Sequence, residues 1–372
     1  MFGRRPDFGA SARSAFAAAC VTLLLARGGA LPHAAGGYST VAVFPIENLS
    51  GEGVPEHEFR VTLIQRLVSA GLRVVDDAAL DAFMVRHRVR YAAGLETATA
   101  QALVQELGVD GVVFASIELS DSLAPPKLAL MARLVSVRDV PTVVWADDVG
   151  LAGDEAPGLF DLGIVNDFEV LQTRALDHVG ASLDGWLKTG APARPMRNRP
   201  TFRPRSEFRS RTLTPGTPHS VAVLPFFNLS DRRNAGEILA WLFTRHLAAF
   251  PEFRVVDAGV TRQQLLNARV IMDGGIALAD AENVASLVDT DLVLAGRVLS
   301  YRDFEGSAGQ TRVEFSTVLF EKSTRRIVFS SISDNTGADG VGWFERGGSK
   351  TAHVMATQMV RRTVEAIAGE GR

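Results

Sequence analysis

Very few residues of this chain have the types and spacing that enzyme chemistry requires. The segment Gly347-Gly348-Ser349-Lys350 partly matches a phosphate-binding loop, but the earlier glycine and a preceding strand are missing, so we predict that it begins a helix. No nucleophile elbow of the form Gly-x-Ser-x-Gly occurs. The histidines after residue 36 lack the paired spacing of metal ligands: His57, His87, His178, His219, His246 and His353. We therefore predict a protein that is not an enzyme and has no catalytic residues, metal site or cofactor.

One pair of carboxylates has the spacing to bind a cation. Asp289 and Asp291 are separated by a single residue, and carboxylate oxygens are the ligands that hard cations prefer. Asp291 has a counterpart in Asp110, which precedes a strand of the same sequence pattern. A role in a turn or at a helix end explains both aspartates, and we favour that interpretation.

The most informative feature is a signature that occurs twice. The sequence Val-Ala-Val-Phe-Pro-Ile-Glu-Asn-Leu-Ser at residues 41–50 returns as Val-Ala-Val-Leu-Pro-Phe-Phe-Asn-Leu-Ser at residues 221–230. Three further pairs of similar segments follow in the same order: 73–76 with 254–257, 109–113 with 290–294, and 158–163 with 342–347. Four matches in one order indicate two tandem copies of one domain.

Each signature predicts a buried strand that ends in a turn. A proline stops the strand, and short asparagine and serine side chains bond to nearby backbone amides. The Asn-Leu-Ser sequence also matches the acceptor pattern for N-glycosylation, but the turn is a sufficient explanation. The residues of this turn signature in the two copies are Pro45, Asn48, Ser50, Pro225, Asn228 and Ser230.

Hydrophobic periodicity predicts the same plan in each copy. A strand, a helix and a strand form a βαβ unit, and two more helices, three antiparallel strands and a closing helix follow. We expect an α/β (α+β) fold, with two tandem copies of a mixed-sheet domain of about five strands with flanking helices. The elements predicted in the first copy are strands 40–46, 72–75, 111–119, 128–137 and 142–149, and helices that begin at 55, 78, 97 and 167.

Length and composition fit this plan. A chain of 372 residues allows two domains of about 150 residues with a leader and a linker. A hydrophobic content of 47% suffices for two cores, and the net charge of −3 indicates no acidic or basic partner. The predicted divisions are a leader at 1–36, a first domain at 38–187, a linker at 188–219 and a second domain at 220–369.

The first 36 residues have the pattern of an export signal. Arg4, Arg5 and Arg13 precede an apolar run at 15–26, which is shorter than the roughly 20 residues that span a bilayer. We predict export to the periplasm or the outer membrane, with an uncleaved membrane anchor as the alternative. Cys20 is the only cysteine. It is either the lipid-attachment residue of a lipoprotein or an ordinary residue of the leader.

The predicted linker is strongly basic. Between Lys188 and Arg211 it contains eight basic residues and one acidic residue, Glu207, and therefore carries a charge of +7. It is rich in proline, so we expect an extended, solvated spacer. The alternative is a contact for an anionic partner, with the candidate residues Arg197, Arg199, Arg203, Arg205, Arg209 and Arg211. We expect no nucleic-acid partner.

Both copies resemble the amino-terminal domain of TolB and its relatives. The resemblance rests on Val-Ala-Val-x-Pro-x-x-Asn-Leu-Ser, on the Arg-Val-Val-Asp that follows a helix, and on the Val-Asp or Thr-Asp that leads into a strand. It covers residues 38–187 and 220–368. The group includes lipoproteins of curli secretion, activators of penicillin-binding proteins and flagellar outer-membrane lipoproteins. The resemblance implies a non-enzymatic adaptor, activator or assembly part in the periplasm or at the outer membrane.

We therefore predict an exported, non-catalytic adaptor or assembly protein of the bacterial cell envelope that binds protein partners. Two alternatives stay open. One is a self-oligomerising outer-membrane or flagellum-associated assembly component, and the other is a periplasmic ligand binder or enzyme that uses the cleft between the copies. The expected partners are an envelope protein or further copies of the chain. Membrane contact is expected only through a lipid anchor or an uncleaved leader.

Overall fold

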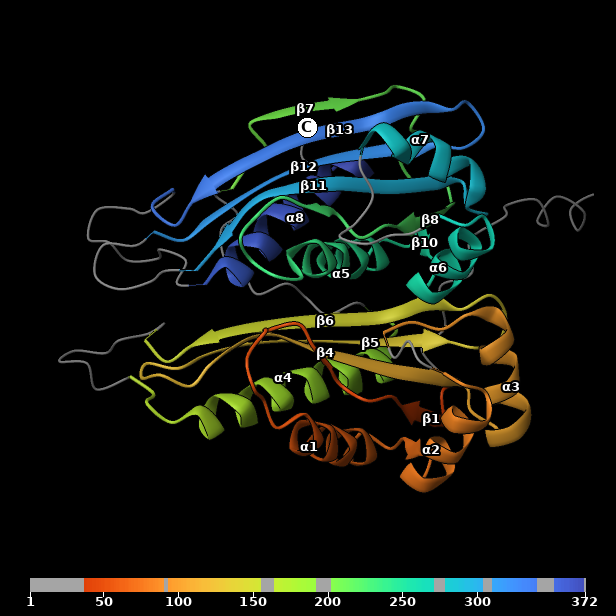
Figure 1. Ribbon diagram of the computed structural model, residues 1–372, viewed down its shortest axis with the longest axis vertical. Coiled ribbons are helices and arrows are strands. Elements are labelled where there is room, and N and C mark those ends of the chain that lie inside the picture. The colour runs from red at the N-terminus through yellow and green to blue at the C-terminus, as the bar shows by residue number, and fades with distance from the viewer. Residues whose placement is uncertain are drawn as a thin grey trace, which may run out of the picture. The chain divides into compact units, whose positions relative to one another are not determined.

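Two mixed β-sheets organise the part of the chain that the structure describes (Figure 1). The computed structural model describes residues 37–89, 93–154, 164–191, 202–270, 278–303, 310–339 and 351–370. The leader with Cys20 lies outside these residues, as do Arg197, Arg199 and the segment 347–350. Both sheets belong to one compact unit, His33–Arg372. We call residues 37–191 the first half and residues 202–370 the second half.

The sheet of the first half has the strand order β3-β1-β4-β5-β6, with the short strand β2 paired to β4. β1 lies parallel to both β3 and β4, whereas β4, β5 and β6 form an antiparallel meander. The strands are β1 (Thr40–Val43), β2 (Glu47–Asn48), β3 (Arg73–Val74), β4 (Gly111–Asp121), β5 (Lys127–Ser136) and β6 (Thr142–Ala152).

The sheet of the second half has the order β10-β8-β11-β12-β13-β7, with β9 paired to β11. Its strands are β7 (Ser206–Arg209), β8 (His219–Val223), β9 (Phe227–Asn228), β10 (Phe253–Val255), β11 (Leu292–Arg302), β12 (Arg312–Glu321) and β13 (Arg326–Thr336). Val41 of β1 pairs with Gly111, and Val221 of β8 pairs with Leu292, so the register also corresponds. The predicted mixed α/β fold is confirmed, with six strands in one sheet and seven in the other.

Short polar side chains fix the ends of the first strands. Asp110 accepts hydrogen bonds from the amide and the hydroxyl of Ser39, both at 2.9 Å. Asp291 accepts the same pair of bonds from Ser220, both at 2.7 Å. The carboxylate of Asp289 is instead bound by a lysine ammonium group at 3.3 Å. Asp289 and Asp291 therefore have separate partners, and the turn interpretation accounts for Asp110 and Asp291.

The two turn signatures have the same hydrogen bonds. Oδ1 of Asn48 accepts from the amide of Ser50 at 3.1 Å and from its hydroxyl at 2.7 Å. Oδ1 of Asn228 accepts from the amide of Ser230 at 3.0 Å and from its hydroxyl at 2.7 Å. Each asparagine amide also donates to the carbonyl four residues later. This is the geometry of an Asx turn, in which a side chain replaces a backbone acceptor.

The helices begin and end at residues suited to those positions. Aspartates at 76, 167 and 257 and a threonine at 351 cap helix N-termini with their side chains. Three helices end at a glycine in the left-handed region, at 108, 190 and 369. The helices are α1 (Glu56–Ser69), α2 (Asp77–Arg86), α3 (Thr97–Leu107), α4 (Phe168–Thr189), α5 (Ala235–Ala248), α6 (Ala258–Asn267), α7 (Leu278–Leu287) and α8 (Ala352–Ala368).

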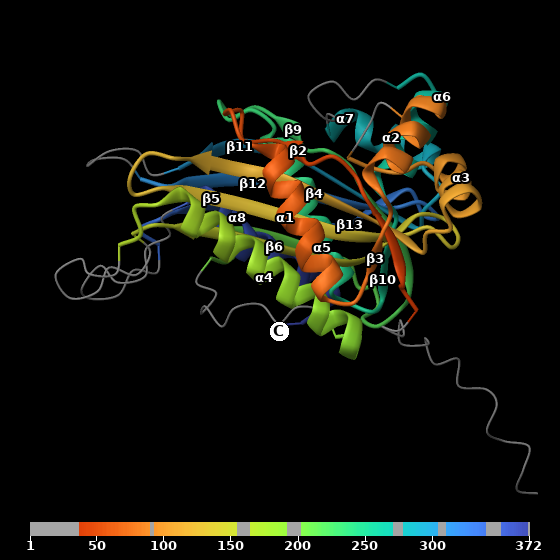
Figure 2. The ribbon, with the colours of Figure 1, turned by 90° about the horizontal axis from the view of Figure 1, so that it is seen from below.

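The helices and sheets are stacked in layers (Figures 1 and 2). α1 and α4 cover one face of the first sheet, and their apolar residues share one core with it. α5 and α8 lie between the two sheets and contact β6 of the first as well as their own sheet. The core around α5 and α8 therefore includes residues of both halves.

Burial differs between the two sheets because of this stacking. Every residue of β5 between its two ends is buried, so both faces of that strand are covered. In β12, buried residues mostly alternate with half-buried ones, as expected of a strand with one solvated face. The first sheet is thus enclosed between helices, and the second has a face that helices α6 and α7 cover only in part.

Part of the predicted linker is a strand rather than a free spacer. β7 pairs antiparallel with β13, so that Ser206 lies opposite Ile332 and Arg209 opposite Phe329. Nearby, Phe202 and Leu213 are buried in the core. The expectation of a solvated spacer was wrong for this segment, because it supplies the backbone partners that the edge of β13 would otherwise lack.

The two halves also meet along strand edges. Thr142 at the start of β6 forms a bridge with Val256, and the amide of Asp257 donates to the carbonyl of Pro141 at 2.9 Å. The side chain of Asp257 in turn accepts a hydrogen bond from the amide of Leu95 at 2.5 Å. Within the described residues, no helix is long and apolar enough to cross a membrane.

We predict that Gly259→Ala destabilises the protein. A Cβ atom at Gly259 in α6 would lie 2.2 Å from the backbone nitrogen of Leu95 in the first half, which cannot move independently. Overpacking of this kind costs about 1–3 kcal/mol or more in the free energy of unfolding, which urea denaturation measures. The control Gly185→Ala, in an exposed part of α4 with no atom within 4 Å of the new methyl group, should instead be neutral or stabilising. Equal effects of the two substitutions would contradict the close contact between the halves.

Candidate functional site: the interface between the halves

The centre of the interface is a buried histidine between two carboxylates. His353 lies in the first turn of α8, where the Thr351 cap fixes the start of the helix. Its Nδ1 is 2.7 Å from Oε2 of Glu118 on β4, and its Nε2 is 3.0 Å from Oδ2 of Asp148 on β6. None of the three side chains is more than 3% exposed. Gly150 permits this approach, since a Cβ atom there would lie 2.9 Å from the histidine ring.

Electrostatics keeps this group charged. Burial lowers the pKa of His353, but the charges of Glu118 and Asp148 and their hydrogen bonds outweigh it and raise that pKa to about 10. Burial raises the pKa of Glu118. The pKa of Asp148 is held well below its usual range, because Arg245 and His353 outweigh the effect of burial. The histidine is therefore an imidazolium that neutralises carboxylates inside the protein.

An arginine of α5 makes the second contact. Nε of Arg245 is 2.6 Å from Oδ1 of Asp148, and its Nη2 is 2.7 Å from Oδ1 of Asp147. His178 of α4 approaches the other oxygen of Asp147 at 3.3 Å, and this hydrogen bond raises the pKa of His178. We call Glu118, Asp147, Asp148, Arg245 and His353 the charge cluster. Two cations from the second half meet three carboxylates from the first half.

A third buried cation, Arg133, lies at the same interface. The guanidinium of Arg133 on β5 stacks over the ring of Trp241 of α5 at 3.7 Å and donates to the carbonyl of Ala93. Its Nε is 4.0 Å from the buried carboxylate of Asp257. Burial raises the pKa of Glu47 nearby to about 7, although Arg133 lowers it. Arg133 thus belongs to the first half but is held mainly by side chains of the second.

The turn signature of the first half takes part in the interface. Arg232 of the second half donates from Nη1 to the carbonyl of Ser50 and from Nη2 to the carbonyl of Glu118, both at 2.5 Å. Asn234 donates to the carbonyl of Leu49 at 3.3 Å. The turn therefore positions backbone acceptors for the other half, in addition to reversing the chain.

The ionised groups of this site bind to one another across the interface between the halves. Its ionised groups are buried and lie against one another, so they neutralise charges that burial would otherwise penalise. Among the described residues, no group of three or more histidine, cysteine, aspartate or glutamate side chains has the arrangement to hold a metal ion. The geometry supports a tight and specific joint between the two halves.

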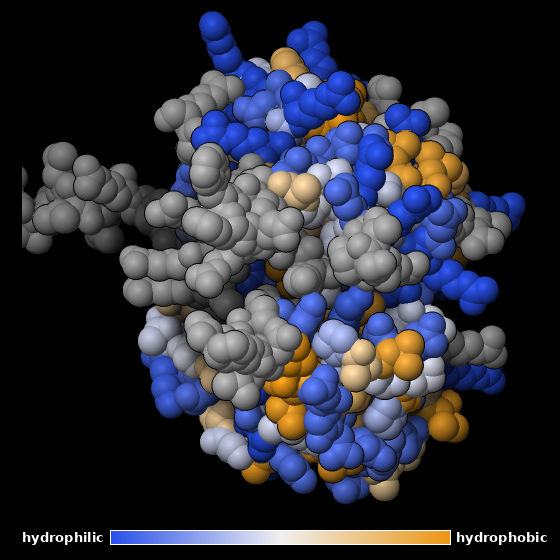
Figure 3. All heavy atoms as spheres, turned by 90° about the vertical axis from the view of Figure 1, so that its left-hand side faces the viewer, coloured by the Kyte–Doolittle hydropathy of each residue, from blue (hydrophilic) through white to orange (hydrophobic). Residues whose placement is uncertain are grey.

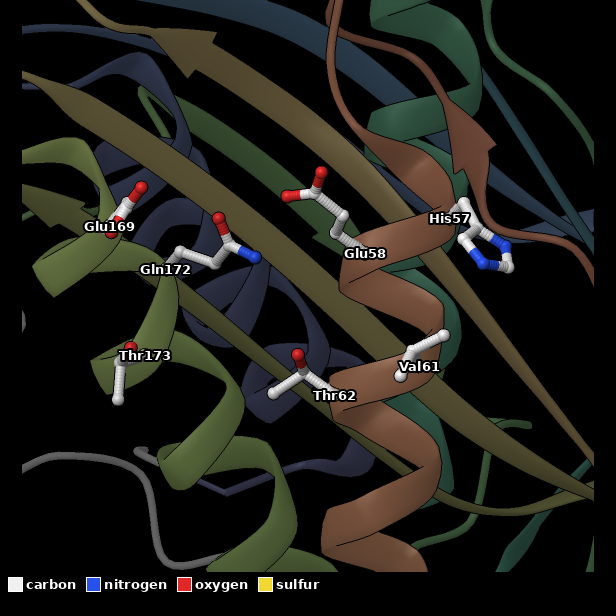
Figure 4. A pocket seen from close by; sticks show the side chains of 7 residues that line it. All are labelled: His57, Glu58, Val61, Thr62, Glu169, Gln172 and Thr173. Atoms are coloured by element: carbon white, nitrogen blue, oxygen red, sulfur yellow. The ribbon is translucent and has the colours of Figure 1, made fainter.

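The first half carries a shallow groove on its outer surface (Figure 4). It lies between α1 and α4 and has a volume of about 530 Å³. Figure 4 shows Glu58 and Gln172 lying between the two helices, with Glu169 beside them. Its lining is His57, Glu58, Val61, Thr62, Glu169, Gln172 and Thr173. This lining is mostly polar and exposed, unlike the charge cluster.

Among the described residues, four of the arginines predicted to bind an anionic partner lie in β7 or close to it. Arg203, Arg205 and Arg211 are exposed. Arg209 is half-buried, and its Nε donates to the carbonyl of Ile367 at 3.1 Å, near the C-terminus of α8. A cation at that end of a helix is stabilised by the helix dipole. Arg209 therefore binds a carbonyl group of its own chain.

The residues of the charge cluster were missed in the sequence. The available signal is a charged residue inside an otherwise apolar strand, as at Glu118 and Arg133. Such residues are rarely buried unless they have partners. Their partners, His353 for Glu118 and Trp241 and Asp257 for Arg133, lie in the second half of the chain, so the pairing could not be read from spacing.

Comparison with known proteins gives only distant likeness. No protein-family model matches the sequence, and no curated protein matches it. A structure of the PelC dodecamer from Paraburkholderia phytofirmans is similar over 45% of this chain and 97% of its own, at 18% identity and a TM-score of 0.30. Lipoprotein GNA1162 from Neisseria meningitidis is similar over 39% of this chain and 99% of its own, at 18% identity and a TM-score of 0.29. The LpoB C-terminal domain from Salmonella enterica is similar over 31% of this chain and 84% of its own, at 17% identity and a TM-score of 0.27.

We predict that His353→Ala strongly destabilises the joint. The substitution leaves Glu118 and Asp148 buried without their shared cation, a defect that costs about 3–5 kcal/mol in the free energy of unfolding. His57→Ala, at an exposed position of the groove, is the control and should change that free energy by less than about 0.5 kcal/mol. Urea denaturation measures both. A loss below about 1 kcal/mol at His353 would show that the cluster contributes little.

Stability should also depend on pH through His353. Its pKa is about 10 in the folded protein, against an ordinary value of 6.5, so its contribution is complete below about pH 6.5 and is lost as the pH rises through about 10. In that window the free energy of unfolding should fall by up to about 1.4 kcal/mol per pH unit. Glu118→Gln/His353→Gln replaces the pair by amides that do not titrate. The wild-type protein should therefore lose stability faster than the double variant between about pH 7 and about pH 10, and parallel curves would contradict this.

Proposed function

We propose that this chain is an exported, non-catalytic adaptor or assembly protein of the bacterial cell envelope. The observation that carries the proposal is the repeated turn signature and strand order, which resembles the amino-terminal domain of TolB and its relatives. We infer that the two halves are tandem copies of one such domain. The leader pattern of arginines and a short apolar run supports export.

The interface between the two halves is filled by their own side chains, and this supports a binding role for the outer surfaces. The titratable groups at the interface are bound to one another, and α5 and α8 fill the space between the sheets. These observations favour an adaptor over an enzyme or ligand binder that uses a cleft between the copies. The groove and the outward face of the second sheet are then the surfaces that remain for protein partners.

Export can be tested with the first 40 residues alone. We expect their fusion to a reporter that is active only outside the cytoplasm to give activity in a bacterial host, because they contain the predicted signal. Replacing Arg4, Arg5 and Arg13 by glutamate should abolish that activity. A Cys20→Ala fusion, compared in its retention by membranes, separates a lipoprotein from a cleaved leader. An inactive wild-type fusion would contradict the proposed location.

Partner binding can be tested by site-specific photocrosslinking in cells. A photoreactive residue at Ile332, on the outward face of the second sheet, should capture an envelope protein, whereas one at the exposed Val85 on α2 should not. Mass spectrometry identifies the captured protein. Capture of the same proteins at both positions, or capture of cytoplasmic proteins alone, would contradict the adaptor proposal.

A further inference from the structure

The second sheet presents an incompletely covered face that contains apolar side chains. Residues on this face of β12, Glu314, Ser316 and Val318, are half-buried, whereas those on its inward face are buried. Apolar side chains of three neighbouring strands are exposed there: Leu299 at 41%, Ile327 at 44%, Ile332 at 45% and Phe208 at 52%. Figure 3, which views the molecule from the left-hand side of Figure 1, shows small groups of hydrophobic residues among hydrophilic ones at the surface. Exposed apolar groups gathered on one face are typical of an interaction surface.

The corresponding face of the first sheet shows what such a surface binds. There the equivalent residues of β5 are Ala129, Met131 and Arg133, and each is at most 1% exposed. They are covered by the helix pair α5 and α8 of the second half, with Trp241 stacked on Arg133. One face of a sheet is thus bound to a pair of helices that belongs to another copy of the same fold.

The helix pair equivalent to α5 and α8 is exposed in the first half. α1 and α5 have the same length, and the turn signatures that precede them are offset by 180 residues. At that offset the buried Phe59 of α1 corresponds to the buried Leu239 of α5. Val61 therefore takes the position of Trp241, and Glu58 that of Ile238. The groove between α1 and α4 is the counterpart of the surface that already holds the first sheet.

We propose that the outward face of the second sheet binds the α1–α4 groove of a second copy of this chain. Within one chain, this type of contact forms once, between the first sheet and the helices α5 and α8. The outward face of the second sheet and the α1–α4 groove are the equivalent surfaces that stay exposed. The contact joins unlike surfaces, so its repetition builds a head-to-tail ring or filament. This inference goes beyond the proposed function. A second copy and an envelope partner compete for this face, so an envelope partner is captured there by chains whose second sheet is not bound to another copy.

The residues on the two surfaces complement one another. The strand registers place Val318 at the position of Arg133, so Val61 and Val318 replace the stack of Trp241 on Arg133 with an apolar contact. Arg297 takes the position of Ser116 on β4. Ser116 pairs with Glu47 of β2, and Glu47 lies beside Trp241. Glu58 takes the position of Ile238, which lies between Trp241 and Asn234, and Asn234 binds the carbonyl of Leu49 next to β2. The same docking therefore places Glu58 on the side of Arg297.

The contact between chains should be weaker than the internal one. Leu299 and Ile332 occupy the positions of Glu118 and Asp148, so the carboxylates that bind His353 have no counterpart on the second sheet. Without buried ion pairs to align it, the contact rests on apolar area and on the Glu58–Arg297 pair. We therefore expect reversible, concentration-dependent assembly.

Charge reversal tests the proposal on the full chain. Sedimentation velocity should show that the wild-type protein associates as its concentration rises. Arg297→Glu and Glu58→Arg should each weaken association by about tenfold or more, since each places like charges together. A mixture of the two single variants should form pairs, because the carboxylate introduced on the sheet of one chain meets the guanidinium introduced in the groove of the other. Asp81→Arg on α2 is the control and should leave association unchanged.

Several outcomes would overturn the proposal. One is a wild-type protein that stays monomeric at the highest concentration reached, and another is equal weakening by the Asp81→Arg control. Failure of the two single variants to pair on mixing would also overturn it, provided that circular dichroism shows both to be folded. None of these results bears on export or on capture of an envelope protein, which the crosslinking experiment measures separately.

Discussion

The pairing of His353 with Glu118 and Asp148 is the interaction on which the arrangement of the two halves depends. Apolar burial around α5 and α8 supplies most of the attraction, but it is not directional. Buried charges are directional in practice, because a small displacement would leave a carboxylate without its cation. The first turn of α8 is thereby fixed against β4 and β6, and Arg245 fixes α5 in the same way.

The two halves share a topology but use it differently. Where they meet, the first half offers Arg133 and the charge cluster carboxylates, and the second offers Trp241 and two cations. At the outer surfaces, the equivalent positions hold smaller, uncharged residues such as Val61 and Val318. One topology thus forms a buried joint inside the chain, and the contact that we propose between chains would use the equivalent surfaces.

Much of the fold could be predicted from the sequence, because strands, helices and turns depend on local patterns. The Asn48 and Asn228 turns and the strand at β5 are of this kind. The charge cluster could not be predicted, since its members are distant in sequence and each resembles an ordinary charged residue. β7 was missed because its residues, Ser206–Arg209, include a glutamate and an arginine, and its pairing depends on the exposed edge of β13 rather than on its own composition.

The enclosure of the first sheet has a consequence for the order of folding. Its second face is covered by α5 and α8, and α8 begins at Ala352, 200 residues after β6 ends at Ala152. A nascent first half therefore leaves Phe114 and Met131 without their final cover until α8 has been synthesised. The first half therefore cannot reach its final stability before the second half has been synthesised. Late closure of this kind would suit a polypeptide that must be threaded through a translocase before it folds.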